Sequence, residues 1–323
     1  KEIRNKYIEK FVNTGSEIYQ KQIKGEYCPK LIYLSGTPYN ILYKFDENQG
    51  EIFTWDYVME QERKNNWDLS KGANPYKGLA QMHIYTYDLH DVYSQNHEIY
   101  TDEDFFSFTE FFRVYKEGEE IDGKKTPKEF DGKFVHEADV KHFLDLLCDN
   151  TVESYYPFST EALRTALKHT FWLLPGVKQV KALEQLINHH PLHTQYGFHV
   201  INVAGDGKSI AEAEAEDDTG WDINAALVKA EKVEKADLAK VKKGVKDHPR
   251  TITLSCGRLT TGVTVPEWTG VFMLAGGYKT GAAAYMQTIF RCQSPYVNGD
   301  IKEHCFAFDF APDRTLTVVD EYI

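Results

Sequence analysis

The second half of the chain alternates short apolar runs with longer segments of helical periodicity, and this alternation constrains the fold more than any other feature. The apolar runs are TFWLLP (170–175), GFHVINVAG (197–205), RTITLSCG (250–257), GVFMLAGG (270–277) and EHCFAFDFAP (303–312). Between them, residues 177–190, 224–246 and 281–292 favour helices. Strands that alternate with helices predict an α/β fold, in which a parallel sheet carries helices on both faces.

The first half of the chain has a less regular pattern. Its candidate strands are residues 31–34 and 81–89, and its candidate helices are residues 1–24, 136–150 and, at the start of the second half, 159–169. The stretch TDEDFFSFTEFFRVY (101–115) fits either a helix packed on the sheet or an insertion with a small core of its own. The polar segment 117–133 indicates a linker or an exposed loop. The length of 323 residues suits two domains or one large one. We expect two domains, residues 1–150 and residues 151–323.

Composition and charge narrow the class of protein. Hydrophobic residues make up 42% of the 323 residues, enough for a sizeable core. No apolar run approaches the roughly 20 residues that span a bilayer, and the first residues lack the apolar core of a signal peptide. The cysteines are odd in number and show no C-x-x-C pair: Cys28, Cys148, Cys256, Cys292 and Cys305. We therefore expect free thiols, a cytoplasmic location and no membrane partner.

The formal net charge of -12 argues against nucleic-acid binding through overall charge, but it leaves a local basic track open. The lysine-rich segment 229–246 is the obvious candidate for such a track. Glu231, Glu234 and Asp237 interleave with its lysines, so a solvated helix face with i,i+4 ion pairs is favoured instead.

Gly207-Lys208-Ser209 matches the tail of a phosphate-binding loop, but its surroundings do not match. The pattern G-x-x-x-x-G-K-[ST] requires glycine at position 202, where the chain has Asn202. The following AEAEAEDDTG (211–220) places five carboxylates where they would repel a triphosphate. We predict a strand that leads into an acidic loop here, and no nucleotide site.

Three other stretches follow one another in a meaningful order. Ser35-Gly36-Thr37-Pro38 follows an apolar run, GRLTTGVTVPEW (257–268) follows another, and QTIFRCQS (287–294) begins within a predicted helix. In this order they resemble motifs III, V and VI of superfamily 2 helicases and translocases. More narrowly, residues 169–186 and 251–271 resemble the motor subunits of bacterial restriction-modification enzymes. The resemblance covers residues of about 155 to 323 well, and residues 31–38 thinly.

This resemblance implies a RecA-like second domain, preceded by the tail of a first RecA-like domain with an aromatic-rich insertion. In the family, the P-loop and the acidic Walker B motif precede motif III, so they would lie upstream of Lys1, and the lack of an initiator Met also indicates a fragment. ATP and Mg²⁺ are expected in the complete protein, whereas the fragment alone is expected to bind neither and to be inactive. The implied partners are DNA, contacted through its backbone, and an upstream domain that carries the P-loop.

The stretch that resembles motif VI supplies the catalytic candidates. Arg291 would reach the γ-phosphate and stabilise the charge that builds on it, because a guanidinium stays charged and holds phosphate oxygens in a fork. Gln287 lies one helical turn earlier on the same face and would orient water or contact the nucleotide. The alternatives are a surface arginine in a helix-end salt bridge and a solvated glutamine. Phe290 and Ser294 replace the glycine and the final arginine of the motif.

The other two stretches supply binding and coupling candidates. The resemblance assigns Thr260 and Thr261 to a nucleic-acid phosphate, Gly262 and Thr264 to the nucleotide, and Ser35 and Thr37 to coupling between ATP state and domain movement. Threonine hydroxyls can bond phosphate oxygens, but an ordinary strand-loop turn at 260–264 and a Thr-Pro turn at 37–38 are the alternatives.

Two alternatives complete the sequence-based expectations. The histidines His189, His190, His193 and His199 are accompanied by no carboxylate or cysteine that completes a plausible site, so we predict no metal. A RecA-like nucleic-acid-binding or interaction module without turnover is the alternative function, and the departures at Phe290 and Ser294 and the negative net charge favour it.

Overall fold

The computed structural model describes residues 53, 55–100, 105–121, 123–151, 156–205, 223–260, 263–276, 282–296, 302–312 and 315. The chain divides into two compact units, Lys1–Ile52 and Phe53–Ile323, and the described residues all belong to the second. The predicted helix at 1–24, the predicted strand at 31–34 and the loop around Lys208 lie outside the described residues.

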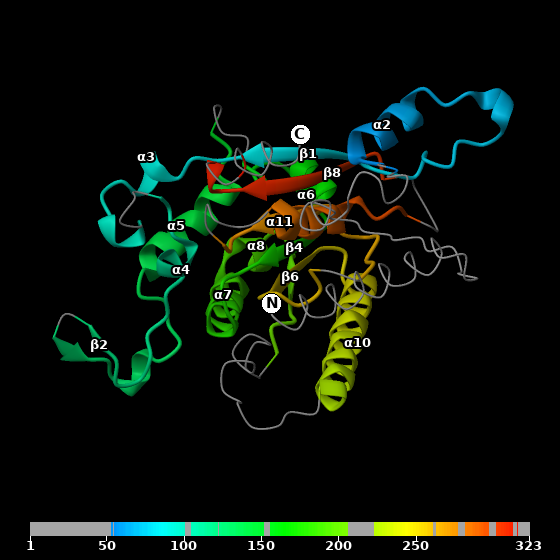
Figure 1. Cartoon of the computed structure of the whole chain (residues 1–323). Helices are drawn as coiled ribbons and strands as arrows, with labels where there is room; N and C mark the ends of the chain where they lie inside the picture. The colour runs from blue at the N-terminus through cyan, green and yellow to red at the C-terminus, as the bar shows by residue number, and fades with distance from the viewer. Residues whose placement is uncertain are drawn as a thin grey trace, which may run out of the picture. The chain divides into compact units, whose positions relative to one another are not determined.

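Six parallel strands form one sheet in the order β1-β8-β7-β4-β6-β5 (Figure 1). The strands are β1 (Gln81–Thr86), β4 (His169–Leu173), β5 (His199–Asn202), β6 (Thr251–Ser255), β7 (Gly270–Met273) and β8 (His304–Asp309). Strands β6 and β7 are buried along their whole length, whereas the edge strand β1 is half exposed. Continuous apolar runs suit strands that are covered on both faces, and the sequence-based α/β prediction is confirmed.

Helices connect these strands. The longer helices are α2 (Tyr57–Asn65), α5 (Glu137–Cys148), α6 (Glu161–Ala166), α7 (Val177–His189), α10 (Ile223–Asp247) and α11 (Ala282–Ile289). The short ones are α3 (His90–Tyr93), α4 (Phe108–Phe111), α8 (Pro191–Thr194), η3 (Leu69–Lys71), η4 (His97–Ile99), η5 (Lys128–Phe130) and η6 (Phe290–Gln293). A separate antiparallel hairpin consists of β2 (Glu120–Ile121) and β3 (Lys124–Lys125), within the segment predicted to be a linker or loop. None of the described helices has the length and apolar content that crossing a membrane requires.

The sheet separates two hydrophobic cores, as the alternation of strand side chains requires. On one face, Trp172 of β4 packs in a core with residues of α5, α7 and α8. On the other face, its neighbour Phe171 packs in a core with residues of α10 and α11. Each helix contributes an apolar stripe, and in α7 this stripe contains Val180, Leu183 and Ile187.

The aromatic segment around residue 108 shares the first of these cores and has no core of its own among the described residues. Phe108, Phe111 and Phe112 are buried in it. The ring of Phe111 meets that of Phe143 on α5 at 5.9 Å, and Phe143 meets Phe310, which follows β8, at 5.0 Å. The segment therefore belongs to the core on this face of the sheet, where it packs against α5.

The sheet crosses the division that we expected at residue 150. Strand β1 comes from the first half of the chain and pairs with β8 from Gln81–His304 to Thr86–Asp309. Helix α5 packs in the same core as the strands of the second half, and the compact unit begins at Phe53. The difference arises because hydrogen bonds and burial join segments that are more than 200 residues apart in the sequence. That residues 1–150 include the tail of a first RecA-like domain stays a prediction.

Candidate functional site

The carboxyl ends of β5 and β6 lie at the same edge of the sheet, since the strands are parallel. Asn202 ends β5 and organises this edge through three hydrogen bonds. Its Nδ2 donates to Glu184 Oε2 of α7 at 2.6 Å, its Oδ1 accepts from the backbone N–H of Ala204 at 3.0 Å, and its backbone oxygen accepts from Lys240 Nζ of α10 at 2.7 Å. Helices from both faces of the sheet are thus fixed to the end of one strand.

An arginine occupies the neighbouring position after β6. Arg258 Nη1 donates to Asp237 Oδ2 of α10 at 2.8 Å, and its backbone oxygen accepts from Ser255 Oγ at 2.6 Å. Its guanidinium lies against Gly205, where a Cβ atom would come within 2.5 Å of Arg258 Nη1. Gly205 also has a φ of +77°, a backbone conformation that favours glycine.

The loop between β6 and β7 contains the residues that resemble motif V. Thr260 Oγ1 donates to the backbone oxygen of Gly257 at 3.0 Å, which closes a local turn. Val263 and Val265 are buried, whereas Thr264 between them is exposed. Thr260 is half-buried. Thr261 and Gly262 lie outside the described residues, as do Ser35 and Thr37.

Arg291 connects this loop to the segment that resembles motif VI. It lies on η6 at the end of α11 and is half-buried. Its Nε donates to the backbone oxygen of Gln287 at 3.0 Å, and its Nη1 donates to the backbone oxygen of Val263 at 2.7 Å. Burial lowers the pKa of the guanidinium below its usual value. A guanidinium nevertheless stays protonated at neutral pH.

The surroundings of Arg291 test the alternative that it forms a helix-end salt bridge. Within the described part of the chain, no carboxylate forms an ion pair with Arg291, and Nη2 makes no further hydrogen bond. The neighbouring Phe290 ring packs against Tyr57 of α2 at 6.1 Å between centroids. Gln293 Nε2 donates to Glu60 Oε1 of α2 at 2.9 Å. Arg291 is therefore a cation held by carbonyl oxygens, and α2 braces the segment that carries it.

The candidate residues are partly brought together. The hydrogen bond of Arg291 joins Val263, next to Thr264, to a segment 28 residues away in the chain. Gln287 contributes its backbone oxygen to Arg291, and its side chain is partly buried.

The sequence analysis missed Lys302, which anchors the far end of the same loop. The residue is 7% exposed, and its Nζ donates to the backbone oxygens of Pro266 and Trp268, both at 2.9 Å. Burial lowers the pKa of this ammonium group. A lysine in a polar stretch before a strand gives no sequence signal of burial, because the carbonyls that hold it lie 34 and 36 residues away.

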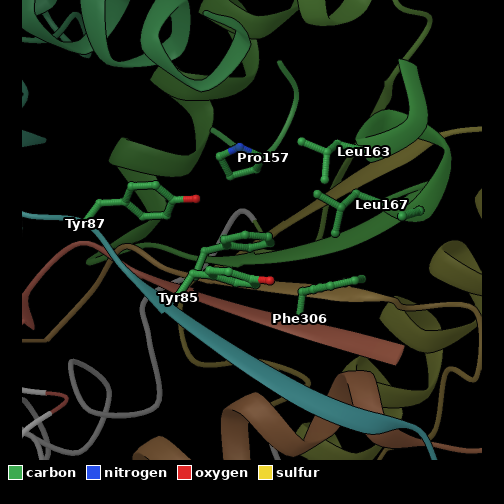
Figure 2. A pocket seen from close by; sticks show the side chains of 8 residues that line it. Tyr85, Tyr87, Pro157, Leu163, Leu167 and Phe306 are labelled. Carbon is green, nitrogen blue, oxygen red and sulfur yellow. The ribbon is translucent and has the colours of Figure 1, made fainter. Parts of the chain in front are cut away.

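An apolar pocket of about 130 Å³ lies where β1 and β8 meet α6, on the face of the sheet that is covered by α5 and α7 (Figure 2). Its walls include Tyr85, Tyr87, Leu163, Leu167 and Phe306. No charged side chain and none of the predicted site residues lines it, so it lacks the cationic donors that bind phosphate.

The four histidines noted in the sequence have local partners. His189 Nδ1 pairs with the backbone oxygen of Gln185, and His193 Nδ1 with that of Phe198. His190 Nε2 lies 3.0 Å from Asp145 Oδ1, and the His199 ring stacks on His248. The described residues contain no group of three or more His, Cys, Asp or Glu side chains that could hold a metal ion.

Comparison with curated proteins finds a relative whose name describes an activity. No protein-family model matches the chain. Over 321 residues the chain is 28% identical to a protein of Mycoplasma pneumoniae (strain ATCC 29342 / M129) that bears the name "Putative type II restriction enzyme and methyltransferase RM.MpnORF110P C-terminus". The match covers 94% of this chain but 40% of the relative, so the chain spans about two-fifths of that protein's length. The name agrees at a coarse level with the restriction-modification part of the resemblance.

Among solved structures, the chain is similar to the "Crystal structure of the C-terminal part of Fun30 ATPase domain". The identity is 12%, the match covers 58% of this chain and 57% of that one, and the TM-score is 0.26. At this TM-score the α/β assignment rests on the parallel sheet of the chain itself.

Proposed function

We propose that this chain is part of an ATP-dependent DNA helicase or translocase, the motor of a restriction-modification enzyme. Three features support the proposal: the order of the three motif-like stretches, the parallel α/β sheet, and the coarse agreement with the name of the Mycoplasma pneumoniae relative. DNA and ATP are the partners in this proposal, and the complete protein is the enzyme.

The observation that carries the proposal is the hydrogen bond of 2.7 Å between Arg291 Nη1 and the backbone oxygen of Val263. Through this bond, the half-buried guanidinium of Arg291 lies at the residue before Thr264, on the loop that the resemblance assigns to nucleotide contact. An arginine that is half-buried among carbonyls has a fixed position, and a fixed donor stabilises developing phosphate charge with little reorganisation. The second domain would supply this guanidinium to ATP bound by the first.

ATP and Mg²⁺ belong to the proposal for the complete protein. Arg291 would be the cation that this chain contributes to a bound phosphate. The metal-holding carboxylates would belong to the acidic Walker B motif, which the resemblance places upstream of motif III. Bound Mg²⁺ would neutralise part of the triphosphate charge.

The proposal is tested by ATP hydrolysis in the full natural polypeptide, measured with and without duplex DNA at several salt concentrations. We expect hydrolysis that duplex DNA stimulates and that salt suppresses steeply, because backbone contacts release counterions. The chain of 323 residues alone should not hydrolyse ATP. Hydrolysis by this chain that disappears in Lys208→Ala would restore the rejected phosphate-binding loop. Absence of DNA-stimulated hydrolysis in the full polypeptide would contradict the motor.

One observation favours a second candidate function, a nucleic-acid-binding or interaction module without turnover. Two N–H groups of Arg291 already donate to backbone oxygens, so this residue also fits a purely structural role. Phe290 and Ser294 stand where the motif has glycine and its final arginine. The two candidates differ in what Arg291 contributes to turnover.

A further inference from the structure

The solvent face of α10 consists mainly of lysines. Its exposed lysines between residues 232 and 247 are Lys232, Lys235, Lys240, Lys242, Lys243 and Lys246. Successive helical residues are separated by about 100° around the axis, and these six fall within one half of the helix circumference. Asp247 is the exposed acid in this stretch, and it pairs with Lys243.

Two of the acids that interleave with these lysines in the sequence, Glu234 and Asp237, lie toward the inner side of the helix. Asp237 is paired with Arg258, and its side chain is 15% exposed. Glu234 is half-buried. Lys243 and Asp247 form an i,i+4 pair of the kind that the sequence predicted, and Lys240 donates to the backbone oxygen of Asn202. Glu234 and Asp237, in contrast, lie on the other side of the helix axis from the exposed lysines. The outward face carries a concentrated positive charge, although the chain as a whole has a net charge of -12.

The backbone of this half of α10 is held in place by packing against the sheet. Val241 is fully buried in the core beneath β5 and β6. Gly244 allows the helix to approach the sheet closely, since a Cβ atom there would come within 2.5 Å of Ile201 Cδ1. The ion pair between Asp237 and Arg258 joins the helix to the loop that contains Thr260.

We propose that this lysine face of α10 binds the phosphate backbone of duplex DNA. From Lys232 to Lys246 the helix extends roughly 21 Å, about the axial length of six base pairs. A row of flexible ammonium groups is suited to phosphates at variable spacing and carries no base specificity. The inference rests on the proposed function, in which DNA is the partner, and adds a surface that the resemblance did not assign.

The test replaces three of these lysines with glutamine in the full natural polypeptide. The variant is Lys232→Gln, Lys242→Gln and Lys246→Gln combined. The matched control is Lys116→Gln, Lys125→Gln and Lys128→Gln, which removes the same charge from exposed lysines around the hairpin of β2 and β3. Binding of a short fluorescein-labelled duplex of random sequence is followed by anisotropy from about 50 to 200 mM salt. Thermal unfolding by circular dichroism verifies that both variants fold.

We expect the α10 variant to bind about tenfold or more weakly at low salt, because three fewer ammonium groups neutralise the phosphates. The slope of log K against log salt should become shallower by about 2–3, near one for each phosphate that is no longer neutralised. The control should retain the affinity and slope of the parent. An unchanged slope in the α10 variant overturns the inference, as does an equal reduction of affinity in the control. Tighter binding of RNA than of duplex DNA contradicts the choice of partner.

The same measurements distinguish this inference from the proposed function. If the parent binds DNA and shows DNA-stimulated ATP hydrolysis while the α10 variant keeps both, the proposed motor is supported and DNA binding by the lysine face is contradicted. If the parent binds no duplex DNA, both fail. If the parent binds DNA through α10 but hydrolyses no ATP, DNA binding by the lysine face is supported and the chain belongs to a binding module.

Discussion

Replacement of Arg291 separates the catalytic from the structural role of this residue. In Arg291→Ala, the backbone oxygen of Val263 loses a charged donor at 2.7 Å, and Val263 is 5% exposed. A hydrogen bond from a charged group contributes about 1.5–3 kcal/mol. The second acceptor is the backbone oxygen of Gln287, on a half-buried turn of α11, where water can partly replace the lost donor. We expect a loss of about 2 kcal/mol in the free energy of unfolding, which lowers Tm by roughly 4–8 °C.

The expected loss of turnover is far larger than this loss of stability. If the guanidinium stabilises the transferring phosphoryl group, its removal should lower the kcat of DNA-stimulated ATP hydrolysis by about 10³–10⁵. Arg291→Lys should keep the charge and the fold, yet lose most turnover, because an ammonium group cannot hold two oxygens in a fork. DNA affinity without nucleotide should stay unchanged in both variants.

A second arginine provides the matched control. Arg164 also donates to a backbone carbonyl, that of Phe158, at 2.5 Å, and it stacks on Tyr196. Arg164→Ala should lower Tm by a similar amount while kcat stays within about twofold of the parent. The catalytic role is refuted if Arg291→Ala loses the expected stability but retains DNA-stimulated hydrolysis. The bonds to Val263 and Gln287 would then be the whole function of Arg291, and the binding module would be the better description.

Three further substitutions test the account of the fold. Burial, and to a lesser extent the nearby Lys168, lowers the pKa of His169 to about 4. As the pH falls, His169 takes up a proton in the unfolded chain at a higher pH than in the folded chain. The free energy of unfolding should therefore decrease from about pH 6.5 toward pH 4, by up to about 3 kcal/mol. The urea midpoint should fall less between pH 7 and pH 5 in His169→Gln. Lys302→Met leaves two loop carbonyls without their donor and should lower Tm by the equivalent of about 1–3 kcal/mol. An unchanged Tm in scanning calorimetry would contradict its anchoring role. Gly244→Val would collide with Ile201 and should cost about 1–3 kcal/mol in urea unfolding. A variant as stable as the parent would show that the helix can move away.

Local patterns predicted the elements of the second half because each of them is dictated by its own side chains. TITLS (251–255) is apolar or β-branched at nearly every position and becomes the fully buried β6. The amphipathic spacing of Val180, Leu183 and Ile187 is sufficient to predict α7. The strands β1 and β8 were both predicted as strands, but their pairing with each other was not. Pairing between strands more than 200 residues apart depends on which edge strand of the sheet still has unpaired backbone groups. Local periodicity contains no information on that.

The candidate site was predictable to a smaller extent. Resemblance placed Val263 and Arg291 in neighbouring motifs, but their hydrogen bond depends on how the loop after β6 folds back over α11. The lysine face of α10 was only partly predicted, for a different reason. Charges were counted along the sequence, where Glu234 and Asp237 separate the lysines. Around the helix axis these two acids fall on the side that faces the sheet, and the arrangement in space decides what a partner meets.

The loop between β6 and β7 is the point at which these observations meet. Near its start, Arg258 ties it to α10 through Asp237. In its middle, the Val263 oxygen holds Arg291, and at its end Lys302 holds two carbonyls next to β7. A phosphate that drew the guanidinium of Arg291 away would remove the donor from the middle of a loop whose two ends stay fixed. On the proposed function, the ion pair between Arg258 and Asp237 would connect this loop to the lysine face of α10. Nucleotide and DNA would then change each other's affinity by one shared free energy.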